Sequence, residues 1–278
     1  MFQFIANIFG YLLKWLYNGI GQNYGIALIL FTIILRIILL PLTIKQQKSM
    51  KKTTELQGKM QEIQFKYKNN PELMNKEIMD LYKRENLSPF SGCISSIVQI
   101  LIILSVFYLV SRPLTYMKKI DPGIIENYRN EISAENDGKI SNYYEIEIIQ
   151  KKAVQDENIK VNMDFLGLDL SKVPSQNMTD IEVYIIPILY VISSIFSIRM
   201  TTGKTKKKEQ NGSSEPDMTQ QMNKSMSYMM PIMAVSIAFV APLGLALYWL
   251  ISNILMILER IVINKYVDSK EEKTLCLK

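Results

Sequence analysis

The stretch YGIALILFTIILRIILLPLTIKQQKSMKK, residues 24–52, is an apolar run that contains a single arginine, Arg36, and is followed after Ile44 by a lysine-rich segment. A run of about 20 apolar residues is long enough to cross the hydrocarbon core of a bilayer. An arginine inside such a run costs roughly 3 kcal/mol on insertion scales. Arg36 must therefore face something other than lipid, and its surroundings carry most of the functional interpretation.

The composition of the whole chain fits a multi-pass membrane protein. Its 278 residues are 48% apolar and carry a net charge of +6, yet the mean hydropathy is only +0.07. Such an average arises when apolar and polar residues are segregated into membrane segments and charged loops. The sequence has no histidine, no phosphate-binding glycine loop, and two cysteines, Cys93 and Cys276, without metal-site spacing. We therefore expect no enzyme, no catalytic residue, no cofactor and no metal site.

Residues 1–22 are predicted to form an amphipathic helix that lies in the external membrane interface. Trp15 and Tyr17 suit the depth of the lipid headgroups. A short membrane anchor or an uncleaved signal remains the alternative. The polar positions of this helix fall on one helical stripe, formed by Gln3, Asn7, Gly10, Lys14 and Asn18.

Hydropathy predicts an all-α polytopic membrane protein with five transmembrane helices in a core that covers residues 23–264. The predicted membrane segments are 23–44, 89–110, 183–198, 225–241 and 244–263. They are joined by a cytoplasmic helical hairpin at 45–87, an external acidic loop at 114–180, a cytoplasmic linker at 201–221 and, after the last segment, a short cytoplasmic tail at 265–278.

The hairpin and the acidic loop differ in their patterns. Two apolar stripes at helical spacing, one ending near Tyr67 and one starting near Met74, flank the breaker Asn69-Asn70-Pro71, which predicts an antiparallel helical hairpin. Residues 118–160 show no sustained periodicity, so partial disorder is expected there. The lysine-rich hairpin, linker and tail fall on one side of the membrane, and the positive-inside rule makes that side cytoplasmic and the N-terminus external.

Each predicted segment offers polar groups at a depth comparable to that of Arg36, which lies about 12 Å from the cytoplasmic end of its segment. No acidic residue is expected beside Arg36, because Glu259 falls near the inner end of the last segment. A dry bundle in which Arg36 donates to Gln99 and backbone carbonyls is one possibility. We favour an unpaired guanidinium in a water-filled cavity that opens to the cytoplasm.

Several motifs resemble the YidC family of membrane-protein insertases, the Oxa-type insertases. They are YNGIGQNYGIALILFTIILRIILLPLTIKQQKSMKK, LQGKMQEIQFKYKNNPELMNKEIMDLYKRENLSPFSGC, FLGLDL and PLGLALYWLISNIL, and the resemblance covers nearly all of 1–112 and 160–264. It implies a five-helix core of the Gram-positive bacterial form with a groove open to cytoplasm and lipid. The family's groove arginine falls on Arg36, with Thr32, Gln99 and Trp249 at other groove positions, whereas Ser197 and the long 114–160 insertion depart from the family pattern.

We therefore expect a chaperone and insertase of the bacterial cell membrane, functional as a monomer, that moves newly made membrane proteins into the bilayer. The expected partners are nascent membrane proteins, lipids and the Sec translocon, with weak ribosome contact and no specific nucleic acid. The alternatives are a small-molecule or anion transporter that binds its substrate at Arg36, and an assembly chaperone that does not insert substrates. The predicted groove residues are Arg36, Thr32, Gln99, Ser194, Ser236, Trp249 and Asn253, and the predicted substrate-capture residues of the hairpin are Lys48, Lys51, Lys52, Met60, Lys66, Lys83 and Arg84.

Overall fold

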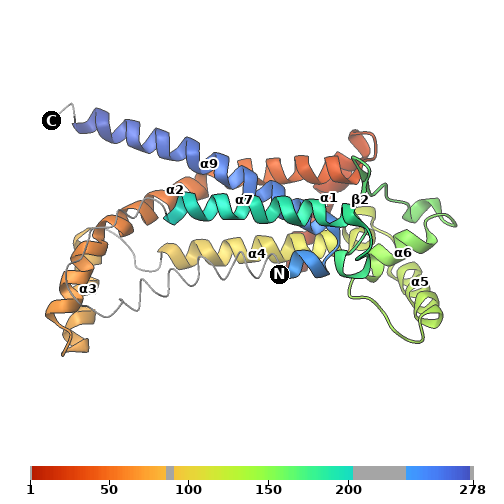
Figure 1. Ribbon diagram of the computed structural model, residues 1–278, viewed down its shortest axis with the longest axis horizontal. Helices are drawn as coiled ribbons and strands as arrows, with labels where there is room; N and C mark the ends of the chain where they lie inside the picture. The colour runs from red at the N-terminus through yellow and green to blue at the C-terminus, as the bar shows by residue number, and fades with distance from the viewer. Residues whose placement is uncertain (1, 86–90, 203–235, 276–278) are drawn as a thin grey trace.

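The computed structural model describes residues 2–85, 91–202 and 236–275, and the fold of these ranges is almost entirely helical, as the sequence predicts. Four long helices lie along one another, with a helical hairpin at one end and the 114–180 region at the other (Figure 1). They are α2 (Tyr24–Lys66), α4 (Ser91–Ser111), α7 (Ile185–Thr202) and α9 (Leu243–Leu275).

Three helical stretches within the described residues are long and apolar enough to cross a membrane: Tyr24–Thr53, Ile181–Met200 and Leu243–Ile263. A shorter apolar stretch, Ile97–Ser111, belongs to α4. The predicted segment 225–241 lies mostly outside the described residues, as does the linker 201–221, and only the helical turn at 236–240 is described. The all-α membrane fold is thus confirmed, whereas the count of five crossings stays a prediction.

Helix α2 is longer than the sequence predicts. It runs for 43 residues through Pro41, without the boundary expected after Ile44. Asn23 caps its start by accepting a hydrogen bond from the amide of Ile26 at 3.0 Å. The residues after Pro41 are mostly lysine, glutamine and glutamate, which favour helix, so the loss of one backbone hydrogen bond at the proline does not end the helix.

The hairpin is formed by the last turns of α2 and by α3 (Pro71–Arg84), which lies at the end of the bundle opposite the 114–180 region (Figure 1). Asn70 caps α3 by accepting from the amide of Leu73 at 3.1 Å, with Pro71 at the first helical position, where the sequence places its breaker. The two helices are joined by an ion pair of Lys59 with Glu85 at 2.8 Å.

The expectation of partial disorder in residues 118–160 is wrong. Helices α5 (Pro122–Glu135) and α6 (Tyr144–Lys152) pack on each other and bury Ile125, Ile132 and Ile148. The remaining elements of this region are the π-helical turn η1 (Leu114–Lys118), the 3-10 turns η2 (Glu157–Ile159), η3 (Pro174–Gln176) and η4 (Ile181–Tyr184), and the antiparallel strands β1 (Asp164–Phe165) and β2 (Leu168–Asp169).

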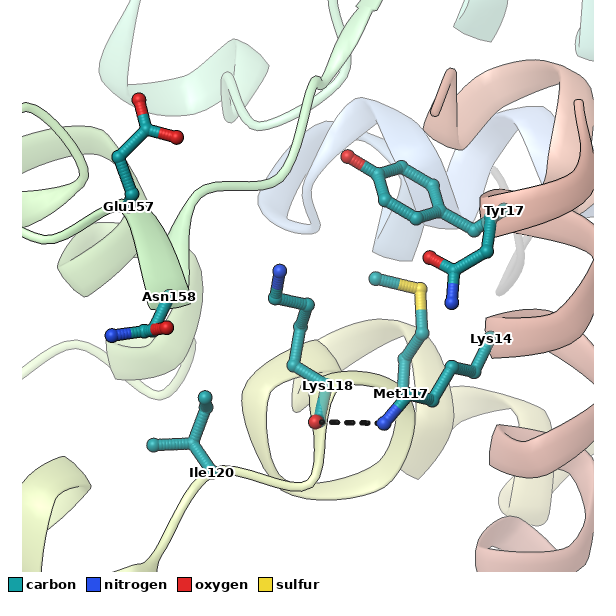
Figure 2. A pocket seen from close by; sticks show the side chains of 8 residues that line it. Lys14, Tyr17, Met117, Lys118, Ile120, Glu157 and Asn158 are labelled. Carbon is teal, nitrogen blue, oxygen red and sulfur yellow. Dashed lines mark hydrogen bonds between the residues drawn. The ribbon is translucent and has the colours of Figure 1, made fainter. Parts of the chain in front are cut away.

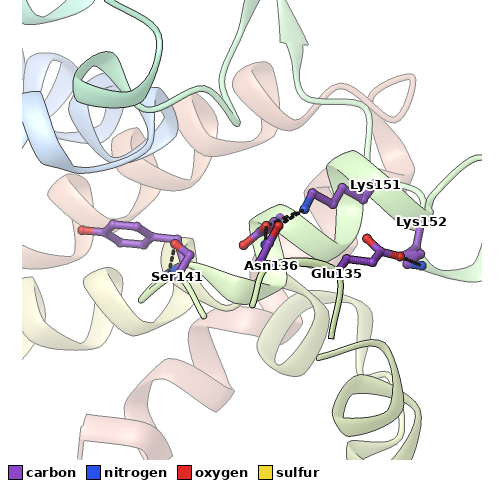
Figure 3. Close-up of polar contacts among 7 residues, drawn as sticks. Glu135, Asn136, Ser141, Lys151 and Lys152 are labelled. Atoms are coloured by element: carbon purple, nitrogen blue, oxygen red, sulfur yellow. Dashed lines mark hydrogen bonds and ion pairs between the residues drawn. The ribbon is translucent and has the colours of Figure 1, made fainter. Parts of the chain in front are cut away.

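Ion pairs between α5 and α6 add to this packing (Figure 3). The Lys152 ammonium lies 3.0 Å from the Glu131 carboxylate and 2.9 Å from that of Glu135. The hydrogen bonds that Lys152 donates to Glu135 and Glu131 raise the pKa of Lys152. The bond from Lys152 and its positive charge lower the pKa of Glu135. Helix α6, with 9 residues, is too short to give a sustained period in the sequence, and α5, although as long as α3, buries only Ile125 and Ile132.

Residues 162–172 hold the starts of two long helices in place. The carbonyl of Asn162 accepts from the amide of Tyr24 at 3.0 Å, at the first turn of α2. The carbonyls of Leu170 and Lys172 accept from the amides of Gly244 and Leu243, both at 2.9 Å, at the first turn of α9. These bonds satisfy amide groups that a helix start leaves without an intrahelical partner.

Helix α1 (Phe2–Gly19) packs on α4, η1 and α2 and leaves an apolar row exposed. Its buried face includes Gly10, where a Cβ atom would lie 1.9 Å from the carbonyl oxygen of Tyr116. The stripe that we expected to face water is therefore divided, because Gly10 is buried and Lys14 contacts the end of η1. The exposed row on the other side of α1 consists of Phe4, Ile8, Tyr11 and Trp15.

Candidate functional site

Arg36 joins α2 to α9. Its Nη2 donates a hydrogen bond of 3.0 Å to the backbone carbonyl of Ser252, and its Nη1 lies 3.6 Å from Oε2 of Glu259. The side chains of Arg36 and Glu259 are only 15% and 12% exposed. The guanidinium is thus held at the contact between two helices, both within candidate membrane spans.

The prediction that Arg36 lacks a counter-ion in its own chain is wrong. Ser252 and Glu259 are seven residues apart, which is about two turns, so they lie on the same face of α9. Glu259 is four residues from the predicted end of its segment, or about 6 Å, and an arginine side chain is long enough to cover most of the remaining difference in depth. The estimate from helix ends placed the two charges too far apart because it ignored the reach of the side chain.

The ion pair of Arg36 and Glu259 nevertheless has poor hydrogen-bond geometry. At 3.6 Å its two atoms are too far apart for a good hydrogen bond, and the buried Oε2 of Glu259 has no hydrogen-bond partner. Removing two charges from water is costly, and the attraction between them repays this cost only when their hydrogen bonds are complete. Another carboxylate that offered better geometry would therefore compete with Glu259 for the guanidinium.

Asn253 and Ser194, two of the predicted groove residues, join α9 to α7. The Asn253 amide donates to the hydroxyls of Ser193 at 2.9 Å and Ser194 at 3.1 Å. One turn earlier on each helix, the rings of Trp249 and Tyr190 lie 6.3 Å apart. The hydrogen bonds of Arg36 with Ser252 and of Asn253 with Ser193 and Ser194 form a layer of polar contacts across α2, α9 and α7, which we call the polar level.

The other predicted groove residues are less closely involved. Thr32 is buried one turn before Arg36 and donates to the carbonyl of Leu28 at 2.7 Å, which satisfies its hydroxyl within α2. Gln99 is half-buried on α4 and is not among the partners of Arg36. Ser236 lies exposed on the helical turn at 236–240. The structure therefore brings together Arg36, Asn253, Ser194 and Trp249, and leaves the roles of all seven residues as predictions.

The predicted capture residues of the hairpin are mostly exposed and lie on both of its helices. Met60 is an exception, since its Sδ accepts from the Tyr82 hydroxyl at 3.7 Å in the seam between α2 and α3. The ammonium of Lys66 lies 5.3 Å from the centre of the Tyr67 ring, and Lys83 pairs with Asp80 at 3.7 Å. The exposed basic residues are Lys48, Lys52, Lys66, Lys83 and Arg84, while Lys51 is half-buried.

Sequence reasoning underestimated one residue of this site, Glu259. The available signal was its spacing of seven residues from Ser252, which places the carboxylate on a face of α9 shared with predicted polar groups. A cluster of lysines outside this site, on α1 and η1, was not singled out at all. Its members are far apart in the sequence, so only the fold brings them together.

The geometry defines a multi-pass helical membrane protein with an arginine ion pair between two of its helices. Residues 15–271 match the family described as 60Kd inner membrane protein, and the chain belongs to this family, that of the YidC/Oxa-type proteins. The chain is similar to the membrane protein insertase YidC of Oceanobacillus iheyensis, with 28% identity over 272 residues that cover 95% of this chain and 85% of the relative.

Other relatives match over different lengths. The chain is 30% identical to the membrane protein insertase YidC of Treponema denticola over 252 residues, which cover 90% of this chain and 36% of that relative. It is 44% identical to the membrane protein insertase YidC of Clostridium perfringens over 91 residues, or 33% of this chain. The chain thus spans little more than a third of the length of the Treponema relative.

Proposed function

We propose that this protein is a membrane-protein insertase, which moves newly made membrane proteins from the cytoplasm into the bilayer. Family membership and the apolar helices support this class of function, as do the printed names of the relatives. In the proposed orientation the hairpin formed by α2 and α3 is cytoplasmic and the 114–180 region is external. The excess of lysine in the hairpin supports this orientation.

The imperfect ion pair of Arg36 and Glu259 is the observation that carries the mechanism. A nascent chain first contacts the exposed basic and apolar side chains of the hairpin. An acidic residue in the tail of that chain then replaces Glu259 beside Arg36, because Glu259 holds the guanidinium at 3.6 Å without a hydrogen bond. The exchange keeps the guanidinium paired with a carboxylate at each stage.

The apolar segment of the substrate then moves past Trp249 into lipid. Hydrophobic transfer at about 25 cal/mol per Å2 drives this step. The membrane potential adds about 2.3 kcal/mol per 100 mV for each negative charge that crosses toward the external side. No covalent chemistry is required, and the hydrophilic groove of this proposal is the polar level formed around Arg36, Ser252 and Asn253.

Insertion of two matched clients into proteoliposomes tests the proposal. The clients carry one identical apolar segment and differ only in a translocated tail that is acidic or neutral. Arg36→Ala is expected to reduce insertion of the acidic client about tenfold, equivalent to about 1.4 kcal/mol, and to leave the neutral client nearly unchanged. Arg199→Ala, at an exposed basic residue of α7, is the matched control and should insert both clients normally.

Glu259→Gln separates exchange from simple structural damage. This variant keeps the shape of the side chain and removes the resident negative charge, so insertion of the acidic client should be retained or increased. Equal loss of both clients in Arg36→Ala would contradict the charge-specific role of Arg36. Accumulation of a small anion by the same liposomes, with no client inserted, would instead support a transporter.

A further inference from the structure

A cavity of about 310 Å3 lies between α1, the end of η1 and η2 (Figure 2). It is remote from Arg36 and belongs to the other end of the bundle, beside the 114–180 region. Its walls include Lys14 and Tyr17 of α1, Lys118 of η1, and Glu157 of η2. The Lys118 side chain extends into the space between α1 and η2, as Figure 2 shows.

Lys14 and Lys118 line this cavity, and a third lysine, Lys119, lies near it on the Asn7 side of α1. Lys14 donates to the carbonyl of Lys118 at 3.4 Å, and Lys119 bonds to the backbone and side chain of Asn7 and lies 4.2 Å from the centre of the Tyr11 ring. Burial lowers the pKa of Lys118 and of Lys119, and the charge of Lys14 lowers both further. The charge of Lys14 therefore opposes those of Lys118 and Lys119, which lie in partly desolvated positions.

The nearby acids are engaged elsewhere. Glu157 forms an ion pair with Lys160 at 3.0 Å. Asp156 accepts hydrogen bonds from Asn158 and from the Tyr128 hydroxyl. In the ranges that the structure describes, no carboxylate lies within 4.0 Å of the ammonium groups of Lys14, Lys118 or Lys119. The cluster thus has a net positive charge that the protein itself does not neutralise by direct pairing.

The cluster lies at the edge of a surface suited to lipid. Lys14 and Asn7 occupy α1 between its buried face and its exposed apolar row, in which Trp15 is 70% exposed. An interfacial helix places such an apolar row among the acyl chains. Lysines beside the row then reach the level of the headgroups, where tryptophan is also favoured.

We propose that Lys14 and Lys118 bind the phosphate of an anionic phospholipid in the leaflet next to the 114–180 region. The phosphate oxygens would accept hydrogen bonds from the ammonium groups and relieve their mutual repulsion. The Tyr17 hydroxyl accepts from the amide of Asn162 at 2.9 Å, so its own proton remains available to a further acceptor at the cavity. A volume of 310 Å3 suits a headgroup, while the acyl chains would lie along the apolar row of α1.

Binding of short-chain lipids to the full-length protein in detergent tests this site. The probes are dioctanoyl phosphatidylglycerol, dioctanoyl phosphatidylcholine and inorganic phosphate, measured by native mass spectrometry and calorimetry. Phosphatidylglycerol should bind more tightly than phosphatidylcholine, since the choline group places a positive charge against the lysines. Binding of phosphatidylglycerol should also exceed that of inorganic phosphate, because only the lipid contacts the apolar row.

Charge-removing variants locate the site. A lysine near a membrane surface contributes about 1 kcal/mol to the binding of anionic lipid, so Lys118→Gln should weaken the affinity for phosphatidylglycerol about fivefold, and Lys14→Gln/Lys118→Gln about 25-fold. Lys118→Arg should restore binding. Lys139→Gln, at an exposed lysine of the same region, is the matched control and should bind as the wild type does.

Three results would overturn the site. They are wild-type affinity in the double variant, equal affinity for the two lipids, and equal affinity for phosphatidylglycerol and inorganic phosphate, the last of which would indicate a free-anion site. Unchanged insertion of a neutral client by Lys118→Gln confirms that the variant is folded. The proposed lipid site requires only that the protein lies in a membrane. It would therefore remain valid if the proposed insertion mechanism were disproved.

Discussion

Glu145 of α6 connects this helix to η1. The side chain is buried and accepts two hydrogen bonds from Thr115, one from the backbone amide at 2.9 Å and one from the hydroxyl at 2.6 Å. Burial raises the pKa of Glu145 above its ordinary value of 4.5, although the bonds from Thr115 and the charge of Arg112 act in the opposite direction. The protonated form is therefore favoured more in the folded protein than in the unfolded chain.

The sign of this shift predicts a pH dependence. Stability contributed by Glu145 is fully present below about pH 4.5 and is lost as the pH rises through the folded pKa. Glu145→Gln mimics the protonated carboxyl, so it should remove this loss. Hydrogen exchange of the amides of α5 and α6, corrected for intrinsic rates, should show protection that falls more between pH 5 and pH 8 in the wild type than in the variant.

Glu126→Gln, at an exposed carboxylate of α5, serves as the control for this measurement and should keep the wild-type dependence. The carboxylates whose pKa values are lowered, Glu135 and Asp156, contribute stability that is lost only as the pH falls below their ordinary values, outside this window. An identical pH dependence in Glu145→Gln and the wild type would contradict the role assigned to the buried carboxyl.

At the scale of single residues, the sequence identified the important charge but not its partner. Arg36 is conspicuous because it is the single charge in a long apolar run. Spacing within α9 places Glu259 on the same face as Ser252, but its pairing with Arg36 depends also on how α2 and α9 align over a separation of 223 positions. The burial of Glu145 was equally hidden, since it results from the contact between α6 and η1, which are about 30 positions apart in the chain.

Among the helices, α1 offers a direct test of close packing. A Cβ atom at Gly10 would lie 1.9 Å from the backbone oxygen of Tyr116, whereas one at Gly19 would meet nothing within 4 Å. Gly10→Ala should therefore destabilise the packing of α1 on η1 by about 1–3 kcal/mol, because a backbone atom cannot move aside as a flexible side chain can. Limited proteolysis of the loop after α1 should become faster in this variant.

Gly19→Ala is the matched control on the same helix and should leave the rate of cleavage unchanged. Equal cleavage of Gly10→Ala and the wild type would show that α1 does not depend on this contact. The amphipathic character of α1 was visible in the sequence, but the face that packs on protein was not. A small residue on a polar stripe looks like a weak polar position until its backbone neighbour is known.

The other helices show where local signals suffice. The cap and proline at Asn70 and Pro71 specify the start of α3 because both act within one turn. The sequence pattern wrongly predicted a helix end after Ile44, whereas α2 continues to Lys66. The change from apolar to charged residues there marks an edge of the membrane and not an end of the helix. Helix α6 was missed because it is too short to show a period, and α5 because it buries few residues and is stabilised by its contact with α6.

At the scale of the whole molecule, Asn253 forms a polar link between α9 and α7. Interhelical hydrogen bonds in membranes contribute about 0.6 kcal/mol on average and up to about 1.7 kcal/mol. Asn253→Ala removes two such bonds, to Ser193 and Ser194, and should lower the midpoint of thermal unfolding in detergent by a few degrees. The arrangement of α2 and α9 around Arg36 should survive, because its contacts do not involve this side chain.

Asn177→Ala, in the 114–180 region, removes a local hydrogen bond to the carbonyl of Val173 and provides a comparison of the same chemical change outside the bundle. A larger loss in this control than in Asn253→Ala would argue against α7–α9 association as a main source of stability. The sequence predicted the all-α membrane architecture from hydropathy alone. It did not predict that residues 162–172 bond to the starts of α2 and α9, since such contacts follow from the assembled fold.

The continuity of α2 has a mechanical consequence. With 43 residues, the helix is about 65 Å long, twice the thickness of the hydrocarbon core, so one rod extends from the 114–180 region to the hairpin. Pro41 interrupts the hydrogen-bond ladder of that rod five residues beyond Arg36 and gives it a natural pivot. A force applied to the hairpin, such as binding of a client in the proposed function, would be transmitted along α2 to the turns that carry Pro41 and Arg36.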